Sequence, residues 1–270
     1  MTPTQLDLFA EAPFADADTA TPGRGEEATA PDALSDEALV AALPDATLGR
    51  AEALAREAAD RGLADAVPAL DALCRRFAGF GRESAVREQR AALEALSGLD
   101  SRHAAEAVGR LITDGIIEGP TLPSALAAAA SLGARLPTAI LEAGLTHEDA
   151  EARAAACRCT GHEPMLVPLL HERLWDATPW VAVAAACALG RMGHPDAGPL
   201  LSRCLREAPS AEVIEAAGAI ADEDMVIRLG RLAGEAPAWR PAVLAVLETL
   251  DHPRAAQILQ RFAENEDAAG

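Results

Sequence analysis

The stretch that decides the fold reads Asp176-Ala-Thr-Pro-Trp-Val-Ala-Val-Ala-Ala-Ala-Cys-Ala-Leu-Gly-Arg-Met-Gly-His-Pro-Asp-Ala-Gly-Pro-Leu-Leu201. Pro179 can begin a helix, because its missing N–H falls where an α-helix has no internal partner. Apolar residues then recur at three-and-four spacing, which gives one apolar face. Gly190 and Gly193 are expected to end the helix, and His194-Pro195 forbids its continuation. A second apolar run starts at once, so the stretch predicts a helix, a short turn and another helix.

Copies of this unit recur along the chain. His252-Pro253 lies 58 residues after His194-Pro195 (252 − 194 = 58), which is twice a period of 29. A helix pair of this kind cannot bury its apolar faces alone and needs copies on either side. Seven pairs are predicted: 47–61 with 65–77, 84–97 with 101–113, 122–132 with 137–143, 149–159 with 165–175, 179–192 with 196–207, 211–221 with 224–233, and 238–250 with 253–264.

The segment Asp176–Leu201 resembles a HEAT-type repeat, in the short bacterial form named after the phycobilisome lyases. That pattern is a turn with Asp and Pro, a Val-x-x-x-Ala-Ala-x-x-Leu-Gly helix, then Ala-x-Pro-Leu-Leu. The other copies match it more loosely, over about residues 47–262. The resemblance implies an all-α, armadillo-like α-solenoid of about seven HEAT-like antiparallel helix pairs. It implies that the helices beginning near 149, 179, 211 and 238 line the concave face, but it implies no single activity.

Three segments are predicted from composition. Residues 1–34 are expected to form a disordered acidic tail, because they are rich in Ala, Asp, Glu, Thr, Pro and Gly. Residues 35–264 form the solenoid, beginning with a short helix that Ser35 caps. Residues 265–270 are expected to be a frayed C-terminus.

Charge and composition exclude several functions. The net charge is −19, so direct nucleic-acid binding is not expected. All 23 basic residues are arginine, which excludes a phosphate-binding lysine of the Walker type and a lysine Schiff base. No apolar run could span a bilayer, and the acidic N-terminus is unlike a signal peptide, so we expect a bacterial cytoplasmic protein.

No catalytic residue, cofactor site or metal site is predicted. Cys157, Cys159, His162 and His171 together resemble a metal-binding set. However, residues two apart on a helix point to different sides, so both thiolates cannot hold one ion without unwinding. The five cysteines are expected to be reduced core residues. The tryptophans at helix starts, Trp180 and Trp239, are expected to pack between repeats.

The first residues of the tail carry a linear motif. Gln5, Leu6, Asp7, Leu8 and Phe9 resemble the pentapeptide by which bacterial polymerases and repair proteins bind the sliding clamp, Gln-Leu-Ser/Asp-Leu-Phe. The resemblance implies that Gln5 fills a small polar pocket while Leu8 and Phe9 enter a hydrophobic cleft. Two alternatives would explain the same residues: the match arises by chance, or the tail folds back onto the end of the solenoid.

The sequence thus predicts a non-catalytic protein-interaction scaffold. In its sharper form, residues 5–9 tether the scaffold to the DNA polymerase sliding clamp in replication or repair, and the solenoid binds a second protein. Two alternatives stay open: a HEAT-repeat adaptor unrelated to DNA, and an enzyme of the HEAT-like lyase type. The lyase alternative would need a small-molecule pocket lined by convergent polar groups.

Overall fold

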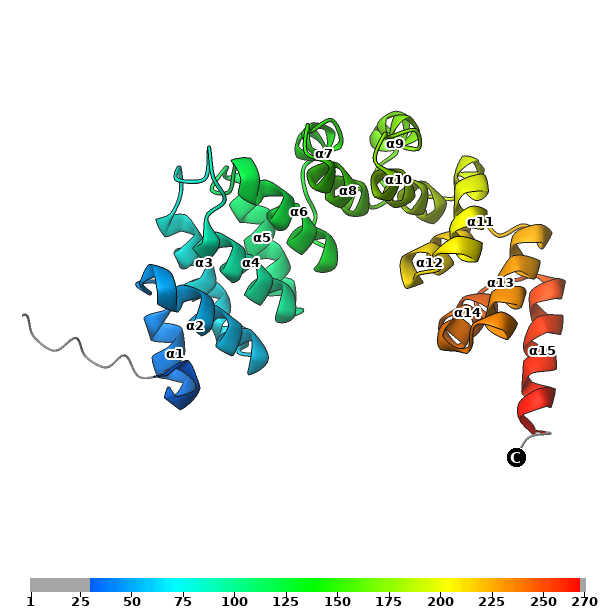
Figure 1. Cartoon of the computed structure of the whole chain (residues 1–270), viewed down its shortest axis with the longest axis horizontal. Coiled ribbons are helices and arrows are strands. Elements are labelled where there is room, and N and C mark those ends of the chain that lie inside the picture. The colour runs from blue at the N-terminus through cyan, green and yellow to red at the C-terminus, as the bar shows by residue number, and fades with distance from the viewer. Residues whose placement is uncertain (1–29, 268–270) are drawn as a thin grey trace, which may run out of the picture.

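The computed structural model describes residues 30–267, and in this range every regular element is a helix (Figure 1). The α-helices are α1 (Asp36–Ala42), α2 (Leu48–Asp60), α3 (Val67–Arg76), α4 (Arg87–Gly98), α5 (Arg102–Thr113), α6 (Leu122–Ser131), α7 (Thr138–Leu145), α8 (Ala150–Cys159), α9 (Val167–Arg173), α10 (Pro179–Arg191), α11 (Gly198–Glu207), α12 (Ala211–Ala219), α13 (Glu223–Glu235), α14 (Arg240–Glu248) and α15 (Pro253–Asp267). The 3₁₀ turns are η1 (Pro31–Ala33), η2 (Ala64–Ala66), η3 (Gly119–Thr121), η4 (Pro164–Leu166), η5 (Pro195–Ala197) and η6 (Pro237–Trp239). None of these helices combines the length and the apolar composition that a bilayer crossing requires.

The helices form two rows that curve together into an arch (Figure 1). Even-numbered helices from α2 to α14 pack side by side, each on the next, as one row. Their partners from α3 to α15 form the other row. Figure 1 shows most clearly from α8 to α14 that the even-numbered row lies on the concave side. The predicted fold class, an α-solenoid of seven antiparallel helix pairs, is confirmed, and so is the placing of α8, α10, α12 and α14 on the concave face.

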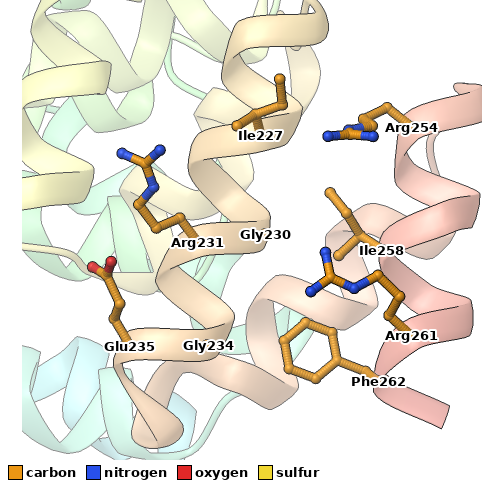
Figure 2. Close-up of a pocket in the computed structure, with 9 residues that line it drawn as sticks. All are labelled: Ile227, Gly230, Arg231, Gly234, Glu235, Arg254, Ile258, Arg261 and Phe262. Carbon is orange, nitrogen blue, oxygen red and sulfur yellow. The ribbon is translucent and has the colours of Figure 1, made fainter. Parts of the chain in front are cut away.

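Small residues let neighbouring helices approach closely. α10 runs past Gly190, so this glycine does not end the helix as expected; Gly193, at φ +80°, follows its C-terminal end. Gly190 instead lies against α12, where an added Cβ would sit 2.8 Å from the carbonyl oxygen of Ala216. Gly230 of α13 likewise leaves room for Ile258 of α15, which Figure 2 shows directed toward it. Helix crossings in this chain therefore depend on glycine as a packing residue.

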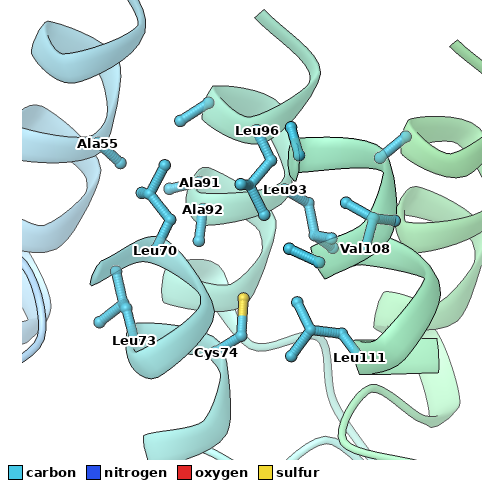
Figure 3. Close-up of a cluster of buried hydrophobic side chains, with 14 of the residues drawn as sticks. Ala55, Leu70, Leu73, Cys74, Ala91, Ala92, Leu93, Leu96, Val108 and Leu111 are labelled. Carbon is cyan, nitrogen blue, oxygen red and sulfur yellow. The ribbon is translucent and has the colours of Figure 1, made fainter. Parts of the chain in front are cut away.

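The core lies between the two rows and falls into two clusters. Figure 3 shows part of the first, where leucines of α3, α4 and α5 converge with alanines and Cys74. The second cluster runs from Leu141 to Ile258. Among residues 30–267, Leu136 and Cys159, both half-buried, are the two that pack against both clusters. The division of the core falls at the third helix pair, α6–α7.

The described N-terminal end is held by one arginine. Ser35 caps α1 as predicted, since its Oγ accepts a hydrogen bond from the Ala38 N–H at 3.3 Å. Arg61, at the end of α2, donates to the carbonyl oxygens of Pro31, Asp32 and Leu34 and to the Asp36 carboxylate at 2.8–3.1 Å. Residues 31–34 therefore pack on the solenoid. At the other end α15 continues to Asp267.

The α3–α4 connection was not foreseen from the sequence. Gln89, fully buried in α4, donates from its side-chain amide to the carbonyl oxygens of Cys74 and Ile116 at 3.1 and 3.3 Å. The N–H of Val86 donates to Thr121 Oγ1 at 3.0 Å. These bonds join α3 and the start of α4 to residues 116–121, which lie between α5 and α6.

We expect Gly190→Ala to destabilise the protein. The new methyl group would meet Ala216 O and Leu201 Cδ1 at 2.8 and 2.9 Å, and forced overpacking typically costs about 1–3 kcal/mol. Gly234→Ala in α13 is the matched control, since nothing lies within 4 Å of its added Cβ and Ala is about 0.5–1 kcal/mol better than Gly in a helix. Urea unfolding should lower the midpoint of the first variant and raise that of the second. An unchanged or higher midpoint for Gly190→Ala would contradict the packing role.

Candidate protein-binding surface

Most inner helices present exposed residues on the concave surface, whereas α10 exposes none between Val181 and Gly190. On α4 and α12 the exposed positions recur at three-and-four spacing, and the remaining positions are buried or half-buried. The exposed positions on α4 include Arg87, Arg90 and Glu94, which with Glu52 of α2 line a hollow of about 220 Å³. The N-terminal part of the surface therefore carries charges of both signs.

Three charged side chains bridge successive inner helices near the middle of the arch. Arg158 of α8 and Arg191 of α10 both donate to Glu212 of α12, each at 3.3 Å. The three side chains are 29–43% exposed, so solvent screens the pairs and each contributes little to stability. Their effect is to fix where charges lie on the concave surface.

The α12–α14 part of the concave surface is mostly apolar. Its groove encloses about 430 Å³ and is lined mainly by small and aliphatic side chains, with Glu215 and Thr249 as the polar members. Val246 and Leu250 line it and are only half-buried. A shallow apolar groove with few polar groups is typical of a surface that binds another protein's side chains.

A buried ion pair fixes the turn between α9 and α10. Arg153 of α8 donates through Nε and Nη2 to the two carboxylate oxygens of Asp176 at 2.8 and 2.9 Å. The same guanidinium donates to the carbonyl oxygens of His147 and Glu148 at 2.9 and 2.8 Å. Asp176 also accepts from the Thr178 N–H at 3.0 Å, and its side chain is only 3% exposed. One arginine thus joins the turns of two successive repeats.

The clamped turn carries two exposed tryptophans. Trp175, directly before Asp176, is 89% exposed, and Trp180, at the start of α10, is 56% exposed. The expectation that Trp180 packs between repeats is therefore wrong, while Trp239 is half-buried. Trp180 is the second residue of α10, and sequence spacing alone does not reveal that this position is exposed. Tryptophan is enriched among residues that dominate protein–protein binding, so this rim is a candidate contact.

The cysteines and histidines that resemble a metal-binding set in the sequence were not predicted to bind a metal. Within residues 30–267 no three His, Cys, Asp or Glu side chains gather where a metal ion could sit. Cys157 is buried, whereas Cys159 is half-buried. The Cys159 thiol donates a hydrogen bond to the carbonyl oxygen of Leu126 at 3.3 Å. Burial raises the pKa of Cys74, Cys157, Cys159 and Cys187 to about 12. These thiols are protonated at neutral pH and poor nucleophiles. The clamp-motif residues Gln5, Leu6, Asp7, Leu8 and Phe9 lie outside the described residues.

Comparison with known proteins bears on the fold. A family model of HEAT repeats matches residues 137–222. The chain is also similar to a chain from the structure of the complex of CpcE and CpcF of phycocyanin lyase from Nostoc sp. PCC7120, with a TM-score of 0.61. That similarity covers 92% of this chain and 98% of the other, at 18% sequence identity, and is therefore one of fold. No curated protein sequence matches. Residues 137–222 thus match a model of HEAT repeats, within a solenoid whose fold is similar to that of a chain in a phycocyanin lyase complex.

We expect Asp176→Asn to lose about 1.5–3 kcal/mol of stability at pH 7, because a hydrogen-bonded charged partner of Arg153 is removed. The Arg153 guanidinium holds the pKa of the Asp176 carboxyl below its usual value. The stability that this pair contributes is therefore present above the carboxyl's unfolded pKa of about 3.9 and is lost as pH falls through the lower folded pKa. Urea unfolding at pH 7 and pH 3 should show the gap between parent and variant narrowing at the lower pH. Asp251→Asn, at an exposed aspartate that pairs with no described residue, is the control and should change little.

The buried thiols give a second measurable outcome. In native protein at pH 8 we expect a chromogenic disulfide reagent to react slowly, because burial keeps the cysteines protonated and covered. In strong denaturant all five should react at once. Rapid reaction of the native protein would mean that the thiols of the core open far more often than this packing predicts.

Proposed function

We propose that this chain is a non-catalytic scaffold that binds a partner protein on its concave surface and on the rim at Trp175 and Trp180. The observation that carries the proposal is the pair of exposed tryptophans on a turn that a buried ion pair clamps. Large apolar side chains held rigidly in solvent bind at little conformational cost. The apolar groove between α12 and α14 offers a second apolar contact.

We further infer that residues 5–9 tether the scaffold to the DNA polymerase sliding clamp, in DNA replication or repair. Support comes from the five-position agreement of Gln5-Leu-Asp-Leu-Phe9 with the clamp-binding pentapeptide. Burying two leucines and a phenylalanine contributes roughly 1.5–3 kcal/mol each, whereas ordering five residues costs roughly 1–2 kcal/mol each. The tether is therefore weak, of micromolar strength or less, and acts by raising local concentration.

Purified full-length protein should bind a bacterial sliding clamp saturably, and Leu8→Ala/Phe9→Ala should abolish this binding. The physical reason is the loss of the two side chains that enter the hydrophobic cleft. Thr19→Ala/Thr21→Ala is the control, because it changes two side chains of the same tail outside residues 5–9 and should leave the affinity unchanged. Surface plasmon resonance with immobilised clamp measures all three. The clamp-tether proposal would be wrong if the parent protein showed no saturable binding at high micromolar clamp concentration, or if the control variant lost as much affinity as Leu8→Ala/Phe9→Ala.

Two other functions predict different outcomes. For an adaptor unrelated to DNA, deleting residues 1–9 would leave every partner bound. An enzyme of the HEAT-like lyase type is the other candidate, because the chain shares its fold with a chain of a phycocyanin lyase complex. A lyase would bind a bilin chromophore, so a bilin absorption change on mixing with this protein would favour that alternative.

A further inference from the structure

The outer row of helices is interrupted between α5 and α7. α5 packs on α3 and on the inner helices α4 and α6, whereas α7 packs on α8 and α9. The two share no extensive contact, and the core divides at the same pair. A cleft of about 780 Å³ lies at this interruption, larger than the other hollows described above.

One face of α5 forms the first wall of the cleft. Its lining residues recur every three or four positions and therefore project from one side of the helix: Arg102, Ala105, Glu106, Gly109, Arg110 and Thr113. In a regular stack the next outer helix would cover this face. Here residues 133–137, which connect α6 to α7, form the opposite wall. They approach α5 closely at Gly109, where a Cβ, if one were added, would lie 3.6 Å from the carbonyl oxygen of Arg135.

The charges in the cleft leave two arginines without partners. Glu106 is paired with Arg102 at 2.9 Å, and Asp114 is paired with Arg75 of α3 at 3.1 Å. Arg110 and Arg135, both exposed, form no side-chain hydrogen bond or ion pair with any residue between 30 and 267. In a chain of net charge −19, two unpaired guanidinium groups at one cleft are a local site for carboxylates.

We propose that the chain's own residues 11–18, Glu11-Ala-Pro-Phe-Ala-Asp-Ala-Asp18, bind in this cleft. Carboxylates of Glu11, Asp16 and Asp18 match the charge of Arg110 and Arg135, and Phe14 matches the apolar part of the lining, which includes Ala105 and Pro137. A segment of the same chain has an effective concentration in the millimolar range. An acidic segment of similar affinity from a separate protein would have to be present at a comparable concentration to displace it.

The distances allow this contact within one molecule. Arg61 holds residues 31–34 at the C-terminal end of α2, and residues 133–137 leave the C-terminal end of α6. Because successive inner helices run in the same direction, both points lie on one edge of the solenoid. Adjacent helices pack about 8–10 Å apart, so crossing α3 and α5 requires roughly 20–30 Å. The 12 residues from 19 to 30 span at most about 40 Å.

This contact would leave the concave surface free and place residues 5–9 beside α5. The acidic segment would then be held on the convex side, away from Trp180 and the groove between α12 and α14. The inference depends on the cleft and the charges alone. It stands or falls separately from clamp binding, which concerns residues 5–9.

A distance measurement on the full chain tests the proposal. Nitroxide labels are placed at Ala17→Cys and at His103→Cys, an exposed α5 position that does not line the cleft; the native cysteines are buried or half-buried. Pulsed electron paramagnetic resonance should show a narrow short-distance population at low salt. This population should be lost near 1 M salt, where the Debye length is about 3 Å.

Charge reversal identifies the arginines. Arg110→Glu/Arg135→Glu should abolish the short-distance population, whereas Arg228→Glu/Arg231→Glu, an equal charge change on α13, should retain it. Circular dichroism verifies that both variants are folded. The proposal is overturned if the population is absent from the parent at low salt or persists in Arg110→Glu/Arg135→Glu. It is equally overturned if excess unlabelled protein removes the population, because the contact would then join two molecules.

Discussion

The close approach of successive inner helices is the constraint on which the rest of this structure depends. α10 presents alanine and glycine to its neighbours, and nearly all of its residues from 181 to 190 are buried although most of them are small. Dispersion contacts between small side chains are strong only at short range. The inner row therefore packs tightly while leucines fill the wider space between the rows. That difference in side-chain size accompanies the curvature of the two rows and the open concave face (Figure 1).

Polar contacts are placed where this packing ends, at the turns. Arg153 and Asp176 join the turns that precede α8 and α10, and Arg61 joins the first described residues to α2. In each case a planar guanidinium satisfies carbonyl oxygens and a carboxylate together, which an ammonium group could not do with the same geometry. A chain whose basic residues are all arginine is well suited to this use. The rim that carries Trp175 is rigid for the same reason.

At the third helix pair the core and the outer row are interrupted together. Both core clusters end near Leu136 and Cys159, and α7 does not cover α5 as α13 covers α11. A solenoid is stabilised mainly by contacts between neighbouring repeats, so an interruption at one pair leaves the others intact. The interruption leaves a cleft of about 780 Å³ at which Arg110 and Arg135 are exposed.

The sequence by itself determined the helix pairs, their number and the side that faces inward, because apolar periodicity and Pro–Gly turns are local signals that each repeat carries. It also located Ser35 as a cap. Only the tertiary structure decided the packing role of Gly190, the exposure of Trp180, the ion pair of Arg153 with Asp176 and the cleft beside α5. Each of these depends on the angle and offset between neighbouring repeats, which small differences in side-chain volume set and no single repeat encodes.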